Sequence, residues 1–529
     1  MNGKLPVTAL WRLSFLLLGS LLLASCVSTQ PPALTPIGPD LTPTNVTPIV
    51  TQARPPSPLQ VTVMDAILQG LANNRALRVQ RMGPALQRTF EKEQDGAFDP
   101  VFSAQLARQK TKAEQPTGSG MDLTNSEATT TSGSVSLSKR FASGTKVSLD
   151  GTLDTETPSL YADEFDTARG GISLTQSLLQ GGSRSANLAS LRQARLDTLA
   201  TEYELRGFAE ALVARIESTY WDYALARRQI EIFTNSMGLA EQQLDETQER
   251  IRLGKTAAVE LSAAEAEVAS RQTGLINARS DLDRVRLQLL LLLNPGGTNA
   301  FQREVELLEQ PVVPDAKLDD VETHVAVACR RRPDLNQARL AVQRGTLEVV
   351  KTRNGVLPKL DLFINLGSSG YADSFSRSVS RVNGDFYDAQ AGVAFEYTLG
   401  NNGAEARSER ARLGEAQSAE MLANMEQLAE VDVRSAYVEV QRSREEVTAT
   451  RVLVRRRQDV LKAESEKFNV NKSTALLVAQ AQRDLLAAQI QLEQSVSSYL
   501  KSFIDLYRLE GSLLERRGIS APGREPVKS

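Results

Sequence analysis

The sequence contains little of what enzymes and metal sites are built from. It has one histidine, His324, and two cysteines, Cys26 and Cys329, in 529 residues. A single histidine allows no Ser–His–Asp set away from position 324, and no CxxC, HExxH or Walker-type loop occurs. His324 falls in a predicted helix and is expected to be a packing or surface residue, and Cys329 a small helix-packing residue. We therefore expect no enzyme activity, no metal, no cofactor and no structural disulfide.

Long apolar runs and an excess of one charge are also missing. After the first 25 residues the longest aliphatic block, at residues 289–293, is far too short for a transmembrane helix. The formal net charge is -3, and basic residues are interspersed with acidic ones throughout the chain. A nucleic-acid-binding protein instead gathers its basic residues on one face or along one helix. We therefore expect no nucleic-acid partner.

The first residues have the layout of a secretory signal. Basic residues without an acid precede an apolar run at residues 13–23, which is too short to span a bilayer. The run ends in Leu-Ala-Ser-Cys at residues 23–26, which resembles a bacterial lipobox and implies a signal peptide at 1–25 and lipid attachment to Cys26. The alternative is an ordinary cleavage site before a cysteine. Residues 26–58, rich in Pro and Thr, are predicted to form an extended tether.

The body of the chain contains the same pattern twice. Two offsets, of 258 and 217 residues, align the second copy with the first on either side of a longer insertion in the first copy. The aligned pairs include Leu77 with Leu335, Pro100 with Pro358, Tyr220 with Tyr437 and Leu253 with Val470. The copies are assigned to residues 59–310 and 311–516. Residues 517–529 are predicted to form a flexible tail.

Each copy is predicted to begin with a helix and to continue into strands. The predicted ranges are about 61–95 and 319–355 for the helices and about 100–180 and 358–400 for the strands. Pro100 and Pro358 separate helix from strand, because Pro cannot continue an α-helix. In residues 360–366 every second residue is aliphatic, which predicts one apolar and one polar face. A transmembrane barrel has such strands, but a half-buried soluble sandwich gives the same pattern.

The longest helical regions are predicted at residues 183–293 and 403–516. Apolar residues recur there every three or four positions, with charged residues between them. Gly254 and Asn471 interrupt the two regions at equivalent places, and both residue types accept the positive φ of a helix C-terminus. Thr256 and Ser473 are the predicted caps of the next helices. Each copy is therefore predicted to contain a hairpin of two long antiparallel helices, on the order of 100 Å long at 1.5 Å per residue.

With these features the chain resembles the TolC-like outer membrane factors. The resemblance covers nearly all of residues 60–516 and rests on the lipobox, the duplicated helix–Pro–strand start, the Leu-Gln-Gly-Gly of residues 179–182 and the tip motif from Phe468 to Ser473. It implies an α+β membrane protein whose duplicated long antiparallel helices form an α-helical tunnel. Its antiparallel strands would contribute to one transmembrane β-barrel shared by a homotrimer. The implied partners are a periplasmic adaptor, an inner-membrane transporter and outer membrane lipid.

Strand number also favours assembly. One chain with four to six strands cannot close a barrel, because about eight strands are the minimum and open edges are not tolerated in lipid. Three chains with four strands each would close a twelve-stranded barrel. Residues 139–145 look like an extra hairpin turn, which would give the first copy four strands and the second copy two. The number of strands per chain therefore stays open.

The two hairpin tips are the predicted site of adaptor docking. The resemblance assigns this contact to Arg252, Leu253, Gly254, Lys255, Thr256, Val470, Asn471, Lys472 and Ser473. These residues also form turns that must be tight, and both roles can hold. Some family members narrow the tunnel entrance with acids after the second tip, where this chain has Leu477 and Gln480. Glu260 stands at the equivalent place in the first copy and is the candidate for an acidic ring, with a solvated helix face as the alternative.

The resemblance implies a passive exit duct of a tripartite efflux system, anchored in the outer membrane, with its helical tunnel in the periplasm. Two alternatives remain. One is a structural lipoprotein with periplasmic helices and a soluble cap of strands, and the other is the same channel in type I protein secretion. Aromatic residues near the strand ends, such as Tyr371 and Phe386, favour the barrel. The transported substrate is not specified by the sequence.

Overall fold

The computed structural model describes residues 58–116, 123–158, 165–254, 257–296, 299–313, 318–383, 385–470, 472–523 and 525–527. The predicted signal peptide, Cys26 and nearly all of the tether lie outside these ranges. The chain forms two compact units. The described parts of unit 1 are Glu93–Leu191 and Leu347–Ala411, and those of unit 2 belong to Gln52–Lys92, Arg192–Thr346 and Arg412–Ser529. Within the described ranges, no helix has both the length and the hydrophobicity needed to cross a membrane.

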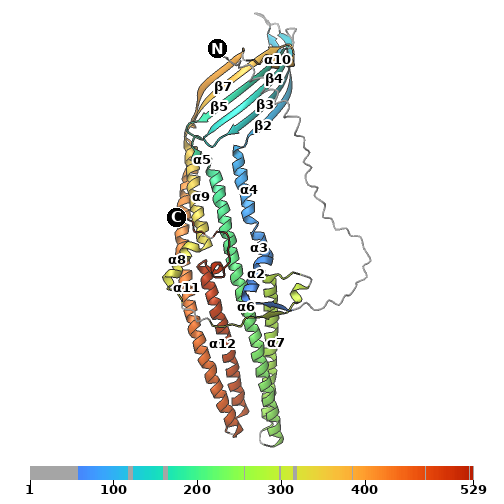
Figure 1. The fold of residues 1–529 in the computed structure, drawn as a ribbon, viewed down its shortest axis with the longest axis vertical. Coiled ribbons are helices and arrows are strands. Elements are labelled where there is room, and N and C mark those ends of the chain that lie inside the picture. The colour runs from blue at the N-terminus through green and yellow to red at the C-terminus, as the bar shows by residue number, and fades with distance from the viewer. Residues whose placement is uncertain are drawn as a thin grey trace, which may run out of the picture. The chain divides into compact units, whose positions relative to one another are not determined.

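Unit 1 is built around an antiparallel sheet of six strands (Figure 1). In sheet order they are β2 (Val101–Pro116), β3 (Leu123–Arg140), β4 (Thr145–Pro158), β5 (Phe165–Ser177), β7 (Lys359–Ala372) and β8 (Tyr387–Glu396). The extra hairpin turn predicted at residues 139–145 is confirmed. It joins β3 to β4, and Gly144 has φ +82° there while its N–H donates to the Phe141 carbonyl at 3.0 Å. The first copy thus supplies four of the described strands and the second copy two.

The register gives this sheet one apolar and one polar face. Directly paired residues share a face. One such row crosses all six strands as Phe102, Leu137, Leu149, Ile172, Leu366 and Ala389. Two rows on the other face flank it. One contains Ser138, Ser148, Ser173, Asn365 and Gln390, and the other contains Ser103, Ser136, Asp150, Gly171, Gly367 and Asp388. The predicted alternation is therefore continuous across the sheet.

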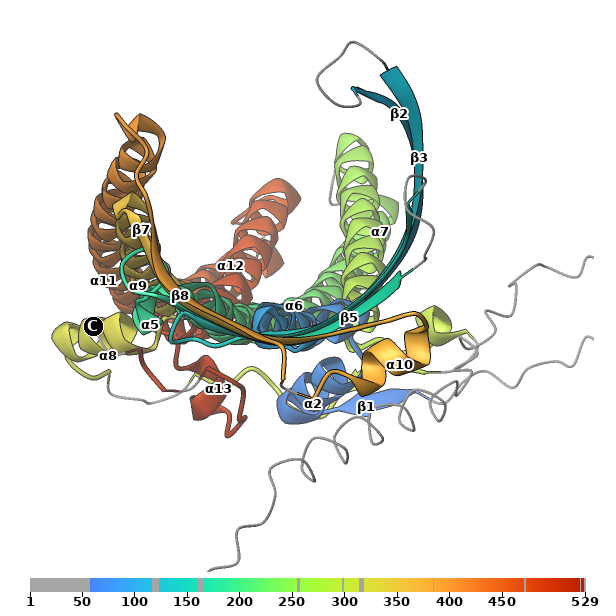
Figure 2. The same cartoon turned by 90° about the horizontal axis from the view of Figure 1, so that it is seen from above.

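Figure 2 shows the sheet as an open arc. The short helix α10 (Phe375–Ser380) lies on its convex side, where the carbonyl of Ser378 leaves no room for a Cβ on Gly370. Gly370 belongs to the apolar face, so the apolar face is convex and the polar face concave. The apolar side chains of the row through Leu149 are 43–56% exposed, apart from Ala389. Within the described sheet, the edge strands β2 and β8 each pair on one side only.

The two predicted helical hairpins are present and lie mostly in unit 2 (Figure 1). The first consists of α6 (Ala189–Arg252) and α7 (Val259–Leu293), and the second of α11 (Asn402–Asn469) and α12 (Ala475–Leu509). The 64 residues of α6 give a helix about 95 Å long. The expected starts and ends differ slightly. A short helix α5 (Arg184–Asn187) precedes α6, and α12 is followed by a separate short helix, α13 (Leu513–Arg516).

The opening helices are divided, whereas the sequence predicted one continuous helix in each copy. The segments are α2 (Val63–Asn73), α3 (Arg75–Gln80), α4 (Gly83–Asp95), α8 (Val321–Arg331) and α9 (Pro333–Val356). The cause of the first break is local capping. Asn74 ends α2 and caps α3, because its Oδ1 accepts a hydrogen bond from the Leu77 N–H at 3.1 Å. In the second copy Pro333 starts a new helix, a position that Pro favours.

The main apolar core of unit 2 surrounds the middle of α6 and the end of α7. Ile216, Tyr220, Leu289 and Leu290 are fully buried there together with Ile67 of α2. The hydroxyl of Tyr220 donates to the carbonyl of Val61 in β1 (Leu59–Val61) at 3.2 Å. β1 pairs in parallel with β6 (Val305–Leu307). This core therefore ties the start of the first copy to its long hairpin.

The predicted flexible tail is wrong for the part of residues 517–529 that the structure describes. Ile519 and Ala521 pack against the core around α6, and the hydroxyl of Tyr203 donates to the Glu525 carbonyl. The Val527 N–H donates to Asn336 Oδ1 at 2.9 Å. The described part of this segment packs because its apolar side chains and backbone groups contact unit 2. Its polar composition did not predict these contacts.

Candidate functional site

The predicted site residues gather at the two hairpin tips in unit 2. Gly254 ends the first helix with φ +69°, and its N–H donates to the Ile251 carbonyl at 2.9 Å. The predicted positive φ at this glycine is confirmed. Lys255, Thr256 and Asn471 lie outside the described residues.

At the second tip the predicted cap is wrong by one residue. Thr474, not Ser473, accepts a hydrogen bond from the Leu477 N–H, at 3.4 Å, and caps α12. Ser473 Oγ instead donates to Glu464 Oε2 at 2.8 Å. The Lys472 N–H donates to the Lys467 carbonyl at 2.8 Å, which widens the turn and moves the cap one position along the chain.

Both tips expose apolar side chains at equivalent positions. Leu253 is 55% exposed and its repeat partner Val470 is 63% exposed. Val259, Leu476 and Leu477 beside them are also exposed. Arg252 is exposed as well and pairs with Glu249 on its own helix. Single exposed apolar residues are common, but a cluster of them is typical of a surface that another protein covers.

One side chain links the two tips directly. The guanidinium of Arg250, near the end of α6, lies 4.0 Å from the ring centroid of Phe468, near the end of α11. It also donates to the Phe468 carbonyl at 3.3 Å. Phe468 itself is buried against Ala475 and Val478 of α12. The ring of the tip motif is therefore held on one side by its own hairpin and on the other by the neighbouring hairpin.

Further ionic contacts join the hairpins away from the tips. Glu267 of α7 lies 2.9 Å from Arg483 of α12, and Glu493 of α12 lies 3.1 Å from Arg228 of α6. Lys501 lies 2.7 Å from Asp222 in the same way. Sequence patterns did not indicate Arg250, Glu267 or Arg483, because charged residues fill every solvated face of these helices. These residues differ from other charged residues of the helices in that their partners lie more than 200 positions away in the sequence.

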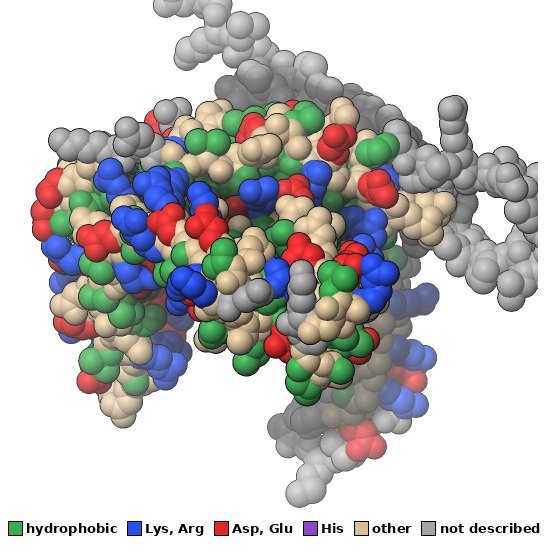
Figure 3. Space-filling view, turned by 90° about the horizontal axis from the view of Figure 1, so that it is seen from below, with side chains coloured by type: hydrophobic (Ala, Val, Ile, Leu, Met, Phe, Trp, Pro, Cys, Tyr) green, Lys and Arg blue, Asp and Glu red, His purple; other side chains and the backbone are tan. Residues whose placement is uncertain are grey.

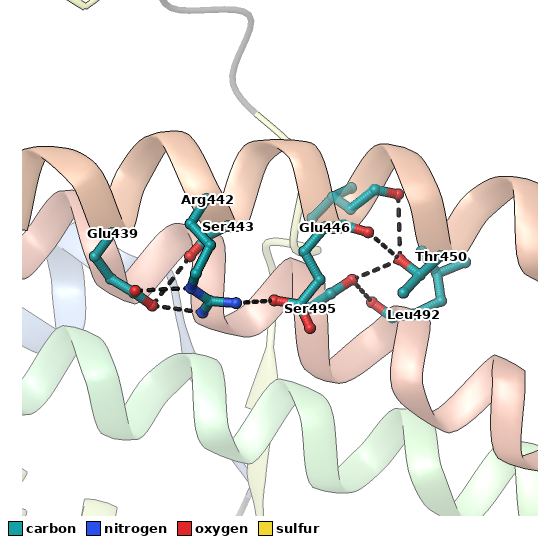
Figure 4. Close-up of polar contacts among 8 residues, drawn as sticks. Glu439, Arg442, Ser443, Glu446, Thr450, Leu492 and Ser495 are labelled. Atoms are coloured by element: carbon teal, nitrogen blue, oxygen red, sulfur yellow. Dashed lines mark hydrogen bonds and ion pairs between the residues drawn. The ribbon is translucent and has the colours of Figure 1, made fainter.

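Within the second hairpin, small hydroxyl residues line the seam between α11 and α12. The hydroxyls of Thr450 and Ser495 lie 3.0 Å apart and are buried (Figure 4). Thr450 Oγ1 also donates to the Glu446 carbonyl one turn earlier, and Ser495 Oγ to the Leu492 carbonyl. These bonds satisfy the buried hydroxyls, so the two helices can approach closely without leaving a polar group unpaired.

Glu260, the candidate for an acidic ring, lies in the first turn of α7. A carboxylate there is favoured by the positive end of the helix dipole. Its side chain is partly exposed, and its repeat partner Leu477 is 46% exposed. The position agrees with either reading of the sequence, so the acidic ring stays a prediction.

His324 belongs to a buried polar cluster in unit 2. Its Nδ1 lies 2.5 Å from Glu510 Oε2, and both side chains are at most 2% exposed. Ser512 Oγ donates to the same carboxylate, and Arg516 lies 3.0 Å from it. Burial raises the pKa of Glu510, but the hydrogen bonds with His324 and Ser512 and the charge of Arg516 outweigh it, so the pKa lies below its usual value. The carboxylate separates serine from histidine, so no nucleophile–base pair exists here.

A second buried cluster holds the start of α13 against α6. Arg206 donates to the Gly511 carbonyl at 3.0 Å and lies 2.6 Å from Glu515 and 3.1 Å from Glu210. Burial raises the pKa of Glu210 to about 7, although the neighbouring Arg206 lowers it. The fully buried Glu217 lies 2.6 Å from Arg517. Both clusters anchor the C-terminal segment and offer no open site.

The described residues contain no group of three or more His, Cys, Asp or Glu side chains that would hold a metal ion. On the face drawn in Figure 3, Lys and Arg side chains lie among Asp and Glu side chains and apolar ones. That face has no stripe of a single charge. The exposed apolar side chains at the tips are the candidate partner surface of unit 2.

Comparison with known proteins agrees with this architecture. A model of the outer membrane efflux protein family matches residues 67–295 and 325–512. The outer membrane protein TolC of Escherichia coli K12 is 23% identical over 280 residues, so the match spans 52% of this chain and 56% of TolC. The CmeC outer membrane channel of Campylobacter jejuni is similar in structure, with TM-score 0.63 and 14% identity over 85% of this chain and 86% of CmeC. VceC of Vibrio cholerae gives TM-score 0.63 and 14% identity over 85% of this chain and 96% of VceC. At these identities the structural likeness shows the fold alone, and the predicted fold class is confirmed.

Replacing Glu210 by Gln should change how stability depends on pH. Because the pKa of Glu210 is raised from 4.5 to about 7, the folded protein favours the protonated carboxyl. That contribution is present below pH about 4.5 and is lost as pH rises through about 7, which amounts to on the order of 3 kcal/mol. The stability of the wild type relative to Glu210→Gln should therefore fall over this range, as measured by urea unfolding followed by circular dichroism. Glu204→Gln, at an exposed position of α6, is the matched control, and a pH-independent difference for Glu210→Gln would contradict the assignment.

Replacing Arg250 by Ala should loosen the contact between the tips. The lost cation–π contact and hydrogen bond are together worth about 1–2 kcal/mol, so the population of separated tips should rise roughly five- to thirtyfold. Spin labels at Leu253 and Val470, in a chain whose Cys329 is replaced, would report this as a longer and broader distance distribution. Arg252→Ala, at an exposed arginine that pairs with Glu249 of its own helix, should leave the distribution unchanged. Equal distributions in both variants would show that Arg250 does not couple the hairpins.

Proposed function

Since this chain belongs to the outer membrane efflux protein family, we propose that it is the outer membrane exit duct of a tripartite efflux system. In this proposal a homotrimer closes one β-barrel in the outer membrane, and its helical hairpins form a periplasmic tunnel. A periplasmic adaptor contacts the tips and delivers substrates from an inner-membrane transporter. The protein is a passive duct rather than an enzyme, and Cys26 carries the lipid that anchors its N-terminus.

The observation that carries this proposal is the sheet of unit 1. Its apolar face is convex and exposed, its polar face is concave, and its two edge strands are unpaired within the described chain. A soluble cap of strands would bury the apolar face and protect the edges. In a barrel shared by several copies, lipid covers the apolar face, water fills the polar lumen and the neighbouring copy pairs with each edge. The structural-lipoprotein alternative leaves both features unexplained.

The tips support the adaptor part of the proposal. The exposed apolar residues Leu253 and Val470 occupy the same place in the two copies, so one kind of partner surface would fit both hairpins. We infer that the docking set comprises Arg252, Leu253, Gly254, Lys255, Thr256, Val470, Asn471, Lys472 and Ser473. Tip opening by separation of Arg250 from Phe468 would then widen the entrance. Small-molecule efflux and protein secretion use the same duct, and the partner transporter selects between them.

The duct itself is tested by conductance and mass. Purified full-length protein should insert into planar bilayers with discrete conductance steps, and its mass in detergent should equal that of three chains. Both outcomes are expected because a single six-stranded sheet cannot close. A monomer without conductance would overturn the channel and favour the structural lipoprotein.

Adaptor docking is tested by photo-crosslinking in cells. A photoreactive amino acid at Val470 should form an adduct with a periplasmic adaptor, which mass spectrometry identifies. The same amino acid at Leu239, an exposed leucine of α6 about 20 Å from the tip at 1.5 Å per residue, is the control and should form no such adduct. Equal adducts at both positions, or none at Val470 in actively exporting cells, would remove the tips as the docking site.

A further inference from the structure

The longer insertion of the first copy corresponds to one structural element, the hairpin β3–β4. The offset between the copies is 258 residues before the strands and 217 after them, so the first copy is longer by 41 residues. Under the first offset β2 corresponds to β7, and under the second β5 corresponds to β8. Among the described strands of the six-stranded sheet, only β3 and β4 have no counterpart in the second copy.

This hairpin continues the wall of the sheet rather than leaving it. β3 pairs with β2 along the whole length of β2, and β4 pairs with β5 over most of both strands. Leu137 and Leu149 lie in the apolar row, and Ser136 and Ser148 lie on the concave polar face. A flap that projected into water would need neither the register nor the two-faced pattern of its neighbours. The hairpin therefore has the chemistry of a strand pair between lipid and an aqueous lumen.

We propose that the hairpin β3–β4 is inserted into the membrane wall, so that three chains close an eighteen-stranded barrel. This inference rests on the trimeric duct proposed above. The strands have 18 and 14 residues, more than the nine to eleven that a tilted membrane strand needs. Each chain has six strands that alternate in direction, so β2 and β8 run in opposite directions. β8 of one copy can therefore pair antiparallel with β2 of the next, and the apolar face continues around the barrel.

The inserted strands widen the duct within the membrane. At a strand spacing of about 4.8 Å and a tilt of about 40°, eighteen strands give a backbone diameter of about 36 Å. Without the hairpin, four strands per chain would give about 24 Å by the same geometry. In this proposal the first copy sets the bore of the duct at the outer membrane.

Cysteine labelling tests whether the hairpin lies in the wall. In a chain whose Cys329 is replaced, Ser148→Cys and Ser136→Cys should react with a charged maleimide added from outside. Leu149→Cys and Leu137→Cys should react about tenfold more slowly, because hydrocarbon excludes a charged reagent. Ser173→Cys and Ile172→Cys on β5 are the matched pair from a strand that both copies share. If this pair alternates and the hairpin positions all react alike, the hairpin lies in water and the inference is wrong.

Electron cryomicroscopy of the full-length protein in nanodiscs gives the strand number directly. The full-length trimer should show eighteen strands, and a variant lacking residues 123–163, which removes the 41 extra residues, should show twelve. The deletion keeps the faces in register, because even-numbered residues face lipid in both β2 and β5. A full-length trimer with twelve strands and a hairpin outside the wall would overturn the inference but leave the duct intact. A protein that is not a trimer would overturn the proposed function instead.

Discussion

The need to pair backbone groups at the two edges of the sheet determines most of this structure. β2 and β8 each present a row of N–H and C=O groups that no described strand satisfies. An unpaired group costs several kcal/mol in hydrocarbon. Over strands of 16 and 10 residues the total exceeds the stability of any ordinary domain. A single chain therefore cannot satisfy these groups in a membrane, and in the proposed trimer the neighbouring copy pairs with both edges. This conclusion depends on backbone chemistry and on no particular side chain.

The helical unit is stabilised differently from the sheet, because water rather than lipid surrounds it. Most of its apolar burial is in the core around Tyr220 and Leu289, where α2, α6 and α7 meet. Toward the tips, apolar burial shrinks to Phe468, Ala475 and Val478, and the hairpins are joined by ion pairs and one cation–π contact. The pairs Arg228–Glu493 and Lys501–Asp222 are partly exposed, and ion pairs of that kind are worth about 0–1 kcal/mol each. Contacts of that size hold one arrangement and still allow another at low cost, which is compatible with the tip opening proposed above.

The sequence predicted the elements of this fold well because their patterns are local. Strand alternation, the hairpin pairs and the turn at Gly144 all follow from residues within one or two turns of each other. The predictions failed in two ways. A cap was assigned to the neighbouring residue, or the contact that orders a segment joins residues far apart in the sequence. Thr474 replaces Ser473 as a cap because the tip turn is wider by one residue. The tail packs because Arg517 meets Glu217 and Val527 meets Asn336, pairs that no local pattern reveals. Arg250 was missed for the same reason, since its partner lies 218 residues away.

The two copies have similar exposed residues at the tip positions where a partner would bind, and they differ in the contacts made within the chain. Leu253 and Val470 expose similar apolar surface at equivalent places, so duplication yields two tips that one kind of partner can bind. The repeat partner of Arg250 is Lys467, which pairs with Glu464 on its own helix. Among the described tip residues, the contact between the two tips therefore comes from Arg250 of the first hairpin. The hairpin β3–β4 shows the same division at the other unit, because only one copy changed its strand number. The two copies therefore differ in the tip contact of Arg250 and in strand number, and they share the exposed apolar position at Leu253 and Val470 that the proposed partner would contact.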